Sequence, residues 1–252
     1  MVNKQRKKQT SKKKTTEEIV LSVKDLQTHF STKWGLVKAV DGVSFDLKKD
    51  ETLAVVGESG SGKSVTALSI MQLIPSPPGF IVGGEINLEG ENLLNKSERD
   101  MQSVRGSRIA MVLQDPMTAL NPVFKISDQV GETLNIHKKL KGKQLYNSII
   151  DMLKKVNIPA PEERMKDYPH QLSGGMRQRV VGAIGVSCSP TILIADEPIA
   201  SVDEKAASNI IHVLKMLIRH SMTESMVRVI IVPINSSFMA QSAYQLRVFR
   251  KN

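Results

Sequence analysis

Cysteine and aromatic residues are scarce in this chain, and no apolar run is long. A single cysteine, Cys188, permits neither an internal disulfide nor a cysteine-based metal cluster. It lies in an apolar run, so we expect it to be buried. No segment reaches the roughly 18–20 apolar residues of a membrane-spanning helix, and no apolar signal-peptide core follows Met1. These features exclude a disulfide scaffold and predict an intracellular protein whose membrane contact is peripheral.

Positive charge is concentrated at one end of the chain. The net charge is +10, and residues 4–14 hold seven of the basic side chains. Residues 1–18 are basic and polar without an apolar pattern, which predicts a disordered tail. The tail is either simply solvated or attracted to anionic lipid, at roughly 1 kcal/mol per basic residue near the surface. Nucleic-acid binding is a further alternative, but no basic, aromatic-interleaved motif elsewhere supports it, so we expect no nucleic-acid partner.

Residues 57–64, GESGSGKS, match the phosphate-binding pattern GxxxxGK[ST]. The apolar run at 52–56 predicts a buried strand before the loop, and residues 65–73 predict a helix after it. The glycines let backbone amides turn inward, and the helix N-terminus adds positive potential. Lys63 would then reach the outer phosphates, and Ser64 would bind Mg²⁺. A ligand-free glycine turn is the alternative, which the strand–loop–helix context disfavours.

Two adjacent carboxylates follow the apolar run at 192–195. This is typical of a parallel strand that ends at its ligand-binding edge. Side chains alternate along a strand, so Asp196 and Glu197 cannot have the same role. We assign Asp196 to the magnesium shell and Glu197 to the attacking water, which it would orient and deprotonate. A solvated turn is the alternative.

Residues 172–179, LSGGMRQR, indicate a second anion site. Ser173, Gly174 and Gly175 directly precede residues 176–186, which have helical spacing. A serine and two glycines at a helix N-terminus can bind phosphate. Two phosphate sites in one chain make sense if the second serves a nucleotide held by a partner subunit. The alternative is an ordinary helix cap.

With these three motifs the chain resembles the nucleotide-binding subunits of ABC transporters over residues 19–215. The stretches VKAVDGVSF (37–45), VLQDPMTALNP (112–122) and YPHQLSGGMRQR (168–179) resemble the oligopeptide, dipeptide and nickel importer subfamily. The resemblance implies an α/β fold, with a RecA-like P-loop NTPase core and an N-terminal antiparallel β subdomain. It also implies a single ATP-binding domain at 19–252 with an inserted α-helical subdomain at about 115–178.

The same resemblance implies ATP and Mg²⁺ as ligands. Gln114 matches the glutamine-loop position that touches Mg²⁺ and the attacking water, and residues 201–203 (SVD) match the D-loop, which contacts the opposite site. The implied catalytic residues are Glu197, Gln114 and Lys63, and the implied metal ligands are Ser64, Gln114 and Asp196. The implied nucleotide-binding residues are Gly57, Glu58, Ser59, Gly60, Ser61, Gly62, Lys63, Ser64, Val65, Trp34, Ser173, Gly174, Gly175 and Asp203.

In this family the adenine stacks on an aromatic residue ahead of the P-loop. Trp34 is the first candidate here and Phe30 the second. Stacking of a base on an aromatic face contributes about 1–3 kcal/mol without base-specific hydrogen bonds. A plain hydrophobic residue in a hairpin loop is the alternative for Trp34.

Departures from the family pattern lie near the end of the chain. Family members carry a histidine that contacts the γ-phosphate after the last central strand. Here the strand predicted at 229–232 is followed by Pro233 and Ile234, and Ile234 can neither hydrogen-bond through its side chain nor carry charge. Residues 216–252 match the subfamily weakly. Either a diverged subunit or a reading-frame change after about Lys215 accounts for this end.

Periodicity predicts the remaining elements. Residues 19–50 alternate as paired strands, 85–94 as a strand and turn, and 109–113 as a central strand. Residues 123–178 are dominated by helical spacing, with a break at 157–161, where two prolines occur.

The sequence therefore predicts an ATP-binding and ATP-hydrolysing subunit that powers an importer for dipeptides, oligopeptides or nickel chelates. Its implied partners are transmembrane permease subunits, a second ATP-binding subunit in a homo- or heterodimer, and indirectly a substrate-binding protein. It would lie at the cytoplasmic face of the membrane. The alternative is a hydrolytically impaired structural subunit that pairs with an active paralogue. An ABC ATPase of DNA repair or translation is disfavoured, because the chain has neither a long coiled-coil insertion nor two such domains.

Overall fold

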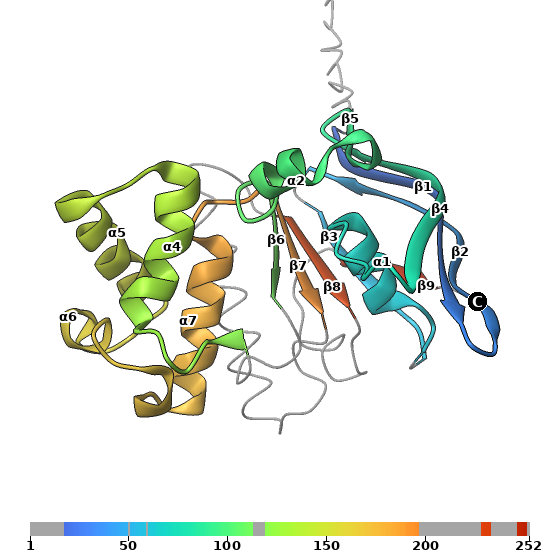
Figure 1. The fold of residues 1–252 in the computed structure, drawn as a ribbon. Helices are drawn as coiled ribbons and strands as arrows, with labels where there is room; N and C mark the ends of the chain where they lie inside the picture. Colours follow the sequence, from blue (N-terminus) through green and yellow to red (C-terminus); the bar gives the residue numbers. More distant parts are fainter. Residues whose placement is uncertain are drawn as a thin grey trace, which may run out of the picture.

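The computed structural model describes residues 18–49, 51–58, 60–112, 119–196, 228–232 and 246–250. Two β-sheets and a group of helices make up this part of the chain, in the order antiparallel sheet, parallel sheet and helical region across Figure 1. None of the described helices is long and apolar enough to cross a membrane. The mixed α/β architecture agrees with the expected fold class.

The antiparallel sheet has the strand order β2-β1-β4-β5. The predicted pairing within 19–50 is confirmed, since β1 (Ile19–Thr32) and β2 (Gly35–Lys48) form an antiparallel hairpin. β4 (Gly79–Leu88) pairs with the other edge of β1, and β5 (Glu91–Asn92) is a short addition. β4 begins at Gly79 rather than at residue 85. Its first half, GFIVGG, lacks the strict alternation that reveals a strand in sequence.

The parallel sheet has the order β6-β7-β8-β3-β9, and its neighbouring strands pair in parallel. The four strands predicted for it are confirmed as β3 (Thr52–Val56), β6 (Ile109–Val112), β7 (Ile192–Asp196) and β8 (Arg228–Val232). The fifth, β9 (Leu246–Arg250), was not expected from the sequence and pairs with β3 along its whole length. In Figure 1 the arrowheads of β6, β7 and β8 lie at one end of the sheet, the end where open α/β folds bind ligands.

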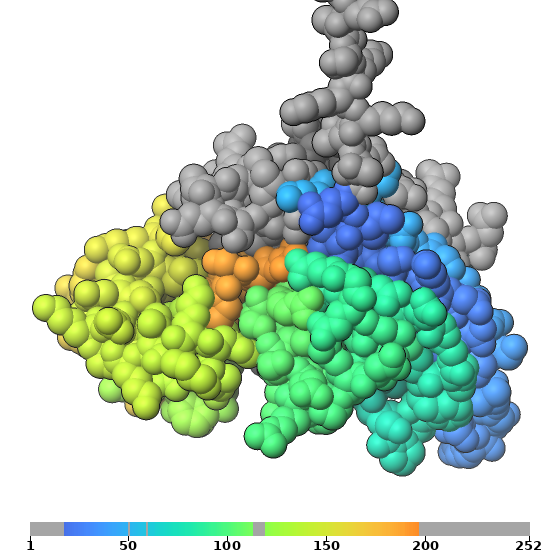
Figure 2. Space-filling model, turned by 90° about the horizontal axis from the view of Figure 1, so that it is seen from above, coloured from blue at the N-terminus to red at the C-terminus, as the bar shows by residue number. Residues whose placement is uncertain are grey.

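The helical region has a hydrophobic core of its own. Residues from α4 (Ile126–Lys138), α5 (Gly142–Lys155) and α7 (Gly174–Val186) pack into one cluster. Pro161 begins the short α6 (Pro161–Arg164), so the proline-containing break separates α5 from α6. The 3-10 turn η2 (Pro169–Gln171) leads into α7. Seen from above in Figure 2, this region forms a lobe at one end of the molecule, opposite the antiparallel sheet.

The other core joins the two sheets. It contains fully buried side chains from β1, β4, β6 and β7, and it includes Ile70 of α1 (Lys63–Ile70). Two further elements, η1 (Leu93–Asn95) and α2 (Glu98–Val104), add Leu93, Met101 and Val104. Packing against β1, β2 and β7 thus holds α1, the helix that follows the glycine-rich loop, between the two sheets.

Candidate functional site

The glycine-rich loop lies between the end of β3 at Val56 and the start of α1 at Lys63. Gly60 and Gly62 have φ angles of 80° and 86°, in the left-handed region that favours glycine. A Cβ atom on Gly62 would stand only 2.1 Å from the carbonyl oxygen of Ala39 in β2. Gly62 is therefore required both by its backbone conformation and by close contact with a neighbouring strand.

Lys63 lies at the centre of the loop. Its side chain is buried, and its ammonium donates hydrogen bonds to the carbonyl oxygens of Gly57 (2.8 Å) and Glu58 (2.5 Å). The hydroxyl of Ser61 is a third partner at 3.3 Å. All three partners belong to the loop, so the buried ammonium stands inside the loop, at the N-terminus of α1. Such an arrangement favours an anion.

Ser64 and Asp196 meet beside this lysine. The Ser64 hydroxyl donates to Oδ1 of Asp196 at 3.0 Å, across 132 residues of sequence. Asp196 is buried and is the last residue of β7. A hydroxyl and a carboxylate are hard oxygen ligands of the kind that Mg²⁺ takes. The structure thus brings together three of the predicted site residues, Lys63, Ser64 and Asp196, and their chemistry fits a magnesium-bound phosphate.

The second predicted phosphate site is the exposed N-terminus of α7. Ser173 is the N-cap, and its hydroxyl accepts a hydrogen bond from the Met176 amide at 3.3 Å. A Cβ atom on Gly174 or Gly175 would meet nothing within 4 Å, so both glycines face open space. α7 packs against α4, α5 and β6, whereas α1 packs against β1, β2 and β7. The glycine-rich loop before α1 and the N-terminus of α7 therefore belong to different parts of the fold.

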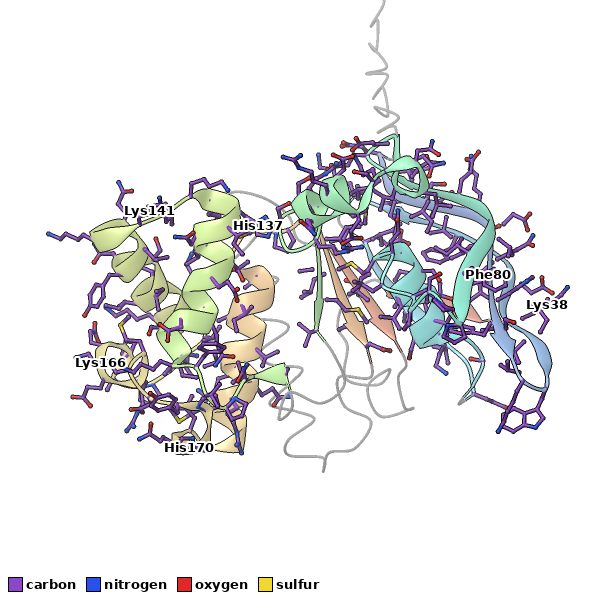
Figure 3. All side chains as sticks on the ribbon, viewed as in Figure 1. Lys38, Phe80, His137, Lys141, Lys166 and His170 are labelled. Carbon is purple, nitrogen blue, oxygen red and sulfur yellow. The ribbon has the colours of Figure 1, made fainter. Side chains whose placement is uncertain are left out.

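The segment before Ser173 is held by local contacts. The Gln171 side chain accepts a hydrogen bond from the Tyr168 amide at 2.8 Å, and the rings of Tyr168 and His170 stack with centroids 5.7 Å apart. In Figure 3, His170 lies at the end of the helical region from which α7 starts. Arg179 in turn donates to the carbonyl oxygen of Asn157 at 2.6 Å. These contacts hold the segment before α7 and the first turns of α7 in place, and no sequence motif predicted them.

The two aromatic candidates differ in exposure. Trp34 lies in the β1–β2 turn, 85% exposed, with the Lys33 ammonium 4.3 Å from its ring centroid. The half-buried ring of Phe30 stands so close to Gly79 that a Cβ atom there would come within 2.7 Å of it. Trp34 shares β2's hairpin with Ala39, the residue that touches Gly62. Of the two rings, that of Trp34 is the more exposed.

Several predicted residues lie outside the described part of the chain. These include Ser59 of the loop, Gln114, Glu197, Asp203 and the position of Ile234. Residues 1–17 also lie outside it.

Cys188 is half-buried rather than fully buried. Its thiol donates to the carbonyl oxygen of Thr133 at 3.6 Å. Burial is the main cause that raises the pKa of this thiol above its usual value. A protonated thiol packed against α4 is a structural contact, in keeping with the packing role expected from the sequence.

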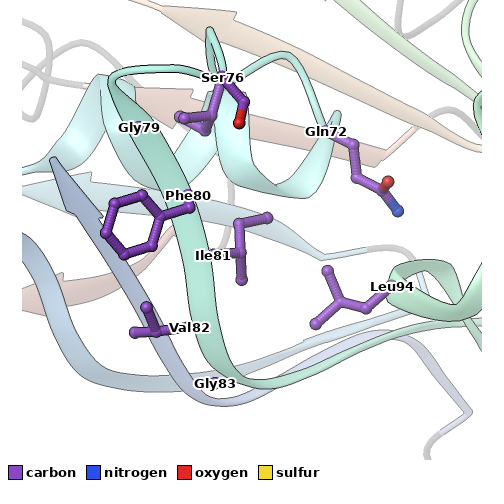
Figure 4. Close-up of a pocket in the computed structure, with 9 residues that line it drawn as sticks. Gln72, Ser76, Gly79, Phe80, Ile81, Val82, Gly83 and Leu94 are labelled. Carbon is purple, nitrogen blue, oxygen red and sulfur yellow. The ribbon is translucent and has the colours of Figure 1, made fainter. Parts of the chain in front are cut away.

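A separate hollow lies along the edge of β4. It measures about 440 Å³ and is lined in part by Gln72, Ile74, Phe80, Val82 and Leu94. Figure 4 shows the Gln72 and Leu94 side chains on one side of it and Phe80 on the other. Its lining includes no residue of the loop at 57–64, so this hollow is distinct from the phosphate site.

Comparison with known proteins agrees with this geometry. The family model described as ABC transporter matches residues 40–200. The oligopeptide transport ATP-binding protein OppD of Bacillus subtilis is 49% identical over 198 residues, which cover 79% of this chain and 55% of that protein. The dipeptide transport ATP-binding protein DppD of Bacillus subtilis is 46% identical over 231 residues, which cover 92% of this chain and 68% of that protein. The chain thus spans about 55–68% of the length of these relatives.

Solved structures show the same fold. A dimeric structure of MJ0796, a bacterial ABC transporter cassette, superposes with a TM-score of 0.72 and 21% identity, covering 91% of this chain and 94% of that one. A post-hydrolysis state of the ATP-binding cassette MJ0796 bound to ADP and Pi gives a TM-score of 0.69 and 22% identity, covering 84% and 87%. Given the family match and the identities of its relatives, the chain belongs to the ABC transporter family.

Proposed function

We propose that this chain binds ATP with Mg²⁺ and hydrolyses it to power import of dipeptides or oligopeptides. The observation that carries the proposal is the buried ammonium of Lys63 inside the loop, beside the Ser64–Asp196 pair. The similarity to peptide-transport ATP-binding proteins supports the substrate class. Nickel chelates are the second candidate cargo, on subfamily resemblance alone.

Lys63 and the N-terminus of α1 would bind the phosphates of the nucleotide. The Lys63 ammonium exchanges its loop carbonyl partners for phosphate oxygens, and the loop amides complete the cradle. Ser64 and Asp196 would hold Mg²⁺, which when bound neutralises charge on the phosphate oxygens. We assign the adenine to the exposed face of Trp34.

Hydrolysis requires a base for the attacking water. Glu197 follows Asp196 directly at the end of β7, and we propose that its carboxylate orients the water and takes its proton during in-line attack on the γ-phosphorus. We assign Gln114 to contacts with the metal and the same water. Lys63 would stabilise the charge that develops on the transferred phosphoryl group.

A second ATP-binding subunit, either a copy of this chain or a paralogue, would complete the site. The open N-terminus of α7, with Ser173, Gly174 and Gly175, suits a phosphate presented by that partner, and Asp203 would contact the opposite site. ATP binding would close the dimer, and hydrolysis would reopen it and drive permease subunits at the cytoplasmic face of the membrane. A substrate-binding protein would deliver the cargo.

One sequence feature favours a second candidate function. Ile234 stands where family members carry a histidine, so the chain is alternatively a hydrolytically impaired subunit that pairs with an active paralogue. The end of the chain nevertheless supplies β8 and β9 on either side of β3.

Nucleotide affinity tests the proposal. In the Lys63→Ala variant we expect tight ATP binding, measured by titration with a fluorescent ATP analogue, to be lost, because the buried cation in the cradle is gone. Lys24→Ala is the matched control: it removes an exposed lysine from β1 and should bind like the parent. Unchanged ATP affinity in Lys63→Ala would overturn the assignment of the loop.

A further inference from the structure

The first turn of α1 carries Lys63, proposed to bind phosphate, and Ser64, proposed to bind Mg²⁺. The position of α1 therefore sets the positions of both side chains. The helix has only eight residues, about 12 Å at 1.5 Å per residue. Its last turn carries no basic residue to balance the negative end of the helix dipole. At the phosphate end, the bond between Ser64 and Asp196 ties α1 to the parallel sheet.

Arg105 supplies the missing positive charge at the other end of α1. Its Nε donates to the carbonyl oxygen of Met71, the C-cap of α1, at 2.8 Å. Its Nη2 donates to the carbonyl oxygen of Gln72, also at 2.8 Å. A planar guanidinium can hold two successive carbonyls in this way, whereas the single ammonium of a lysine cannot form the same fork.

Gln72 is itself fixed in this position. Its φ angle of 50° marks the residue at which the helical path stops, and its side-chain amide donates to the carbonyl oxygen of Leu93. The Leu73 amide donates back to the carbonyl oxygen of Leu68 at 2.8 Å, which closes the end of the helix. The guanidinium of Arg105 therefore binds a defined turn rather than a frayed end.

Arg105 is anchored to the sheet that carries Asp196. It is the C-cap of α2 and forms a backbone bridge with Ile109, the first residue of β6. β6 pairs with β7, which ends at Asp196. Glu98 also accepts two bonds from the guanidinium, at 2.6 and 3.1 Å. Both ends of α1 are thus fixed to the same pair of strands, by Asp196 at one end and by Arg105 at the other.

We infer that Arg105 is a positioning residue of the nucleotide site: it holds the C-terminal end of α1 and thereby keeps Lys63 and Ser64 aligned for the phosphates. The inference rests on the proposed function. Arg105 touches neither Lys63 nor Ser64 and acts through the helix between them. Its loss lets α1 shift against β7 and weakens phosphate binding without removing any phosphate ligand.

The experiment measures the Kd for Mg²⁺–ATP of the full chain, well below its unfolding midpoint, by titration with a fluorescent analogue. Arg105→Met keeps the aliphatic stem and loses the fork, and a Kd about fivefold above that of the parent is expected. Arg105→Lys keeps the charge and should give an intermediate Kd, about twofold above the parent. Arg99→Met removes an exposed arginine from the same helix and should match the parent.

The outcomes are distinct. A purely structural role for Arg105 would lower the unfolding midpoint yet leave the Kd of the folded Arg105→Met variant at the parent value, which overturns the inference. If Arg105→Met does not fold, Arg105→Lys decides: a raised Kd supports the inference, and a parental Kd overturns it. If the parent chain binds no ATP, both the proposed function and this inference are refuted. If the parent binds ATP and Arg105→Met has the same Kd, the inference alone is refuted.

Discussion

Gly62→Ala should damage the nucleotide site more than any other one-methyl change in the loop. Gly62 is the N-cap of α1, with φ 86° and ψ 12°, where an L-residue is disfavoured by about 1–2 kcal/mol. The added Cβ would also stand 2.1 Å from the Ala39 carbonyl oxygen, well below the 3.0 Å limit of real Cβ contacts. That atom is backbone in the middle of β2, so it cannot swing away as a flexible side chain would.

The contact must therefore be relieved by about 0.9 Å of backbone movement, the difference between the two distances. Overpacking of this kind costs about 1–3 kcal/mol, so with the strain the loss of unfolding free energy is about 2–5 kcal/mol. Gly62 directly precedes Lys63, so the same movement displaces the lysine. A displaced ammonium loses its charge-assisted hydrogen bonds to phosphate, each of which contributes about 1.5–3 kcal/mol, so we expect the Kd for ATP to rise about 10- to 100-fold.

Gly90→Ala is the control for backbone strain. Gly90 lies in the turn between β4 and β5 with φ 84°, and a Cβ atom there meets nothing within 4 Å. This variant should lose about 1–2 kcal/mol from strain and keep the parental Kd. Urea unfolding gives the stability, and titration with a fluorescent ATP analogue gives the Kd. Gly62→Ala binding ATP within threefold of the parent would refute the argument that the loop is set against β2.

Two further predictions concern the proposed contacts of the base and the partner subunit. Trp34→Ala should raise the Kd for ATP about tenfold, since base stacking contributes about 1–3 kcal/mol. It should leave urea unfolding unchanged, because the ring is exposed. A Kd equal to that of the parent would show that the adenine binds elsewhere. Gly174→Asp should leave stability equal or slightly higher, because an acid at the N-terminus of α7 suits the helix dipole. It should nevertheless abolish ATP-dependent dimers in size-exclusion chromatography, and dimers at the parental level would contradict the role of this helix.

Much of the fold could be predicted because its signals are local. The strand at Thr52–Val56, the glycine-rich loop and the helix after it follow from one short stretch of sequence. β7 was evident from its continuous apolar run, which is typical of a strand buried on both faces. The first half of β4 and the whole of β9 were missed, because glycines or arginines interrupt their apolar pattern.

The residues of the candidate site were predicted from the sequence, but the contacts that position them were not. Lys63, Ser64 and Asp196 were identified from their motifs, and the structure joins the Ser64 hydroxyl, next to Lys63 in the chain, to the Asp196 carboxylate. The contact of Gly62 with Ala39 joins two segments that no local pattern relates. The same holds for Arg105, whose bonds to Met71 and Gln72 depend on how α2 packs against the end of α1. Contacts between segments far apart in the sequence leave no periodic pattern from which they could be predicted.

Steady-state ATP hydrolysis is the most direct test of the proposed function. It is measured for the purified chain, alone and with a paralogous subunit and the membrane partners, and compared with Glu197→Gln. We expect turnover in the parent that falls at least about 100-fold in Glu197→Gln, the usual contribution of a general base, while ATP binding is kept. Equal turnover in both proteins would show that Glu197 is not the base. ATP binding without turnover in any combination would contradict hydrolysis by this chain and favour the impaired subunit that Ile234 suggests.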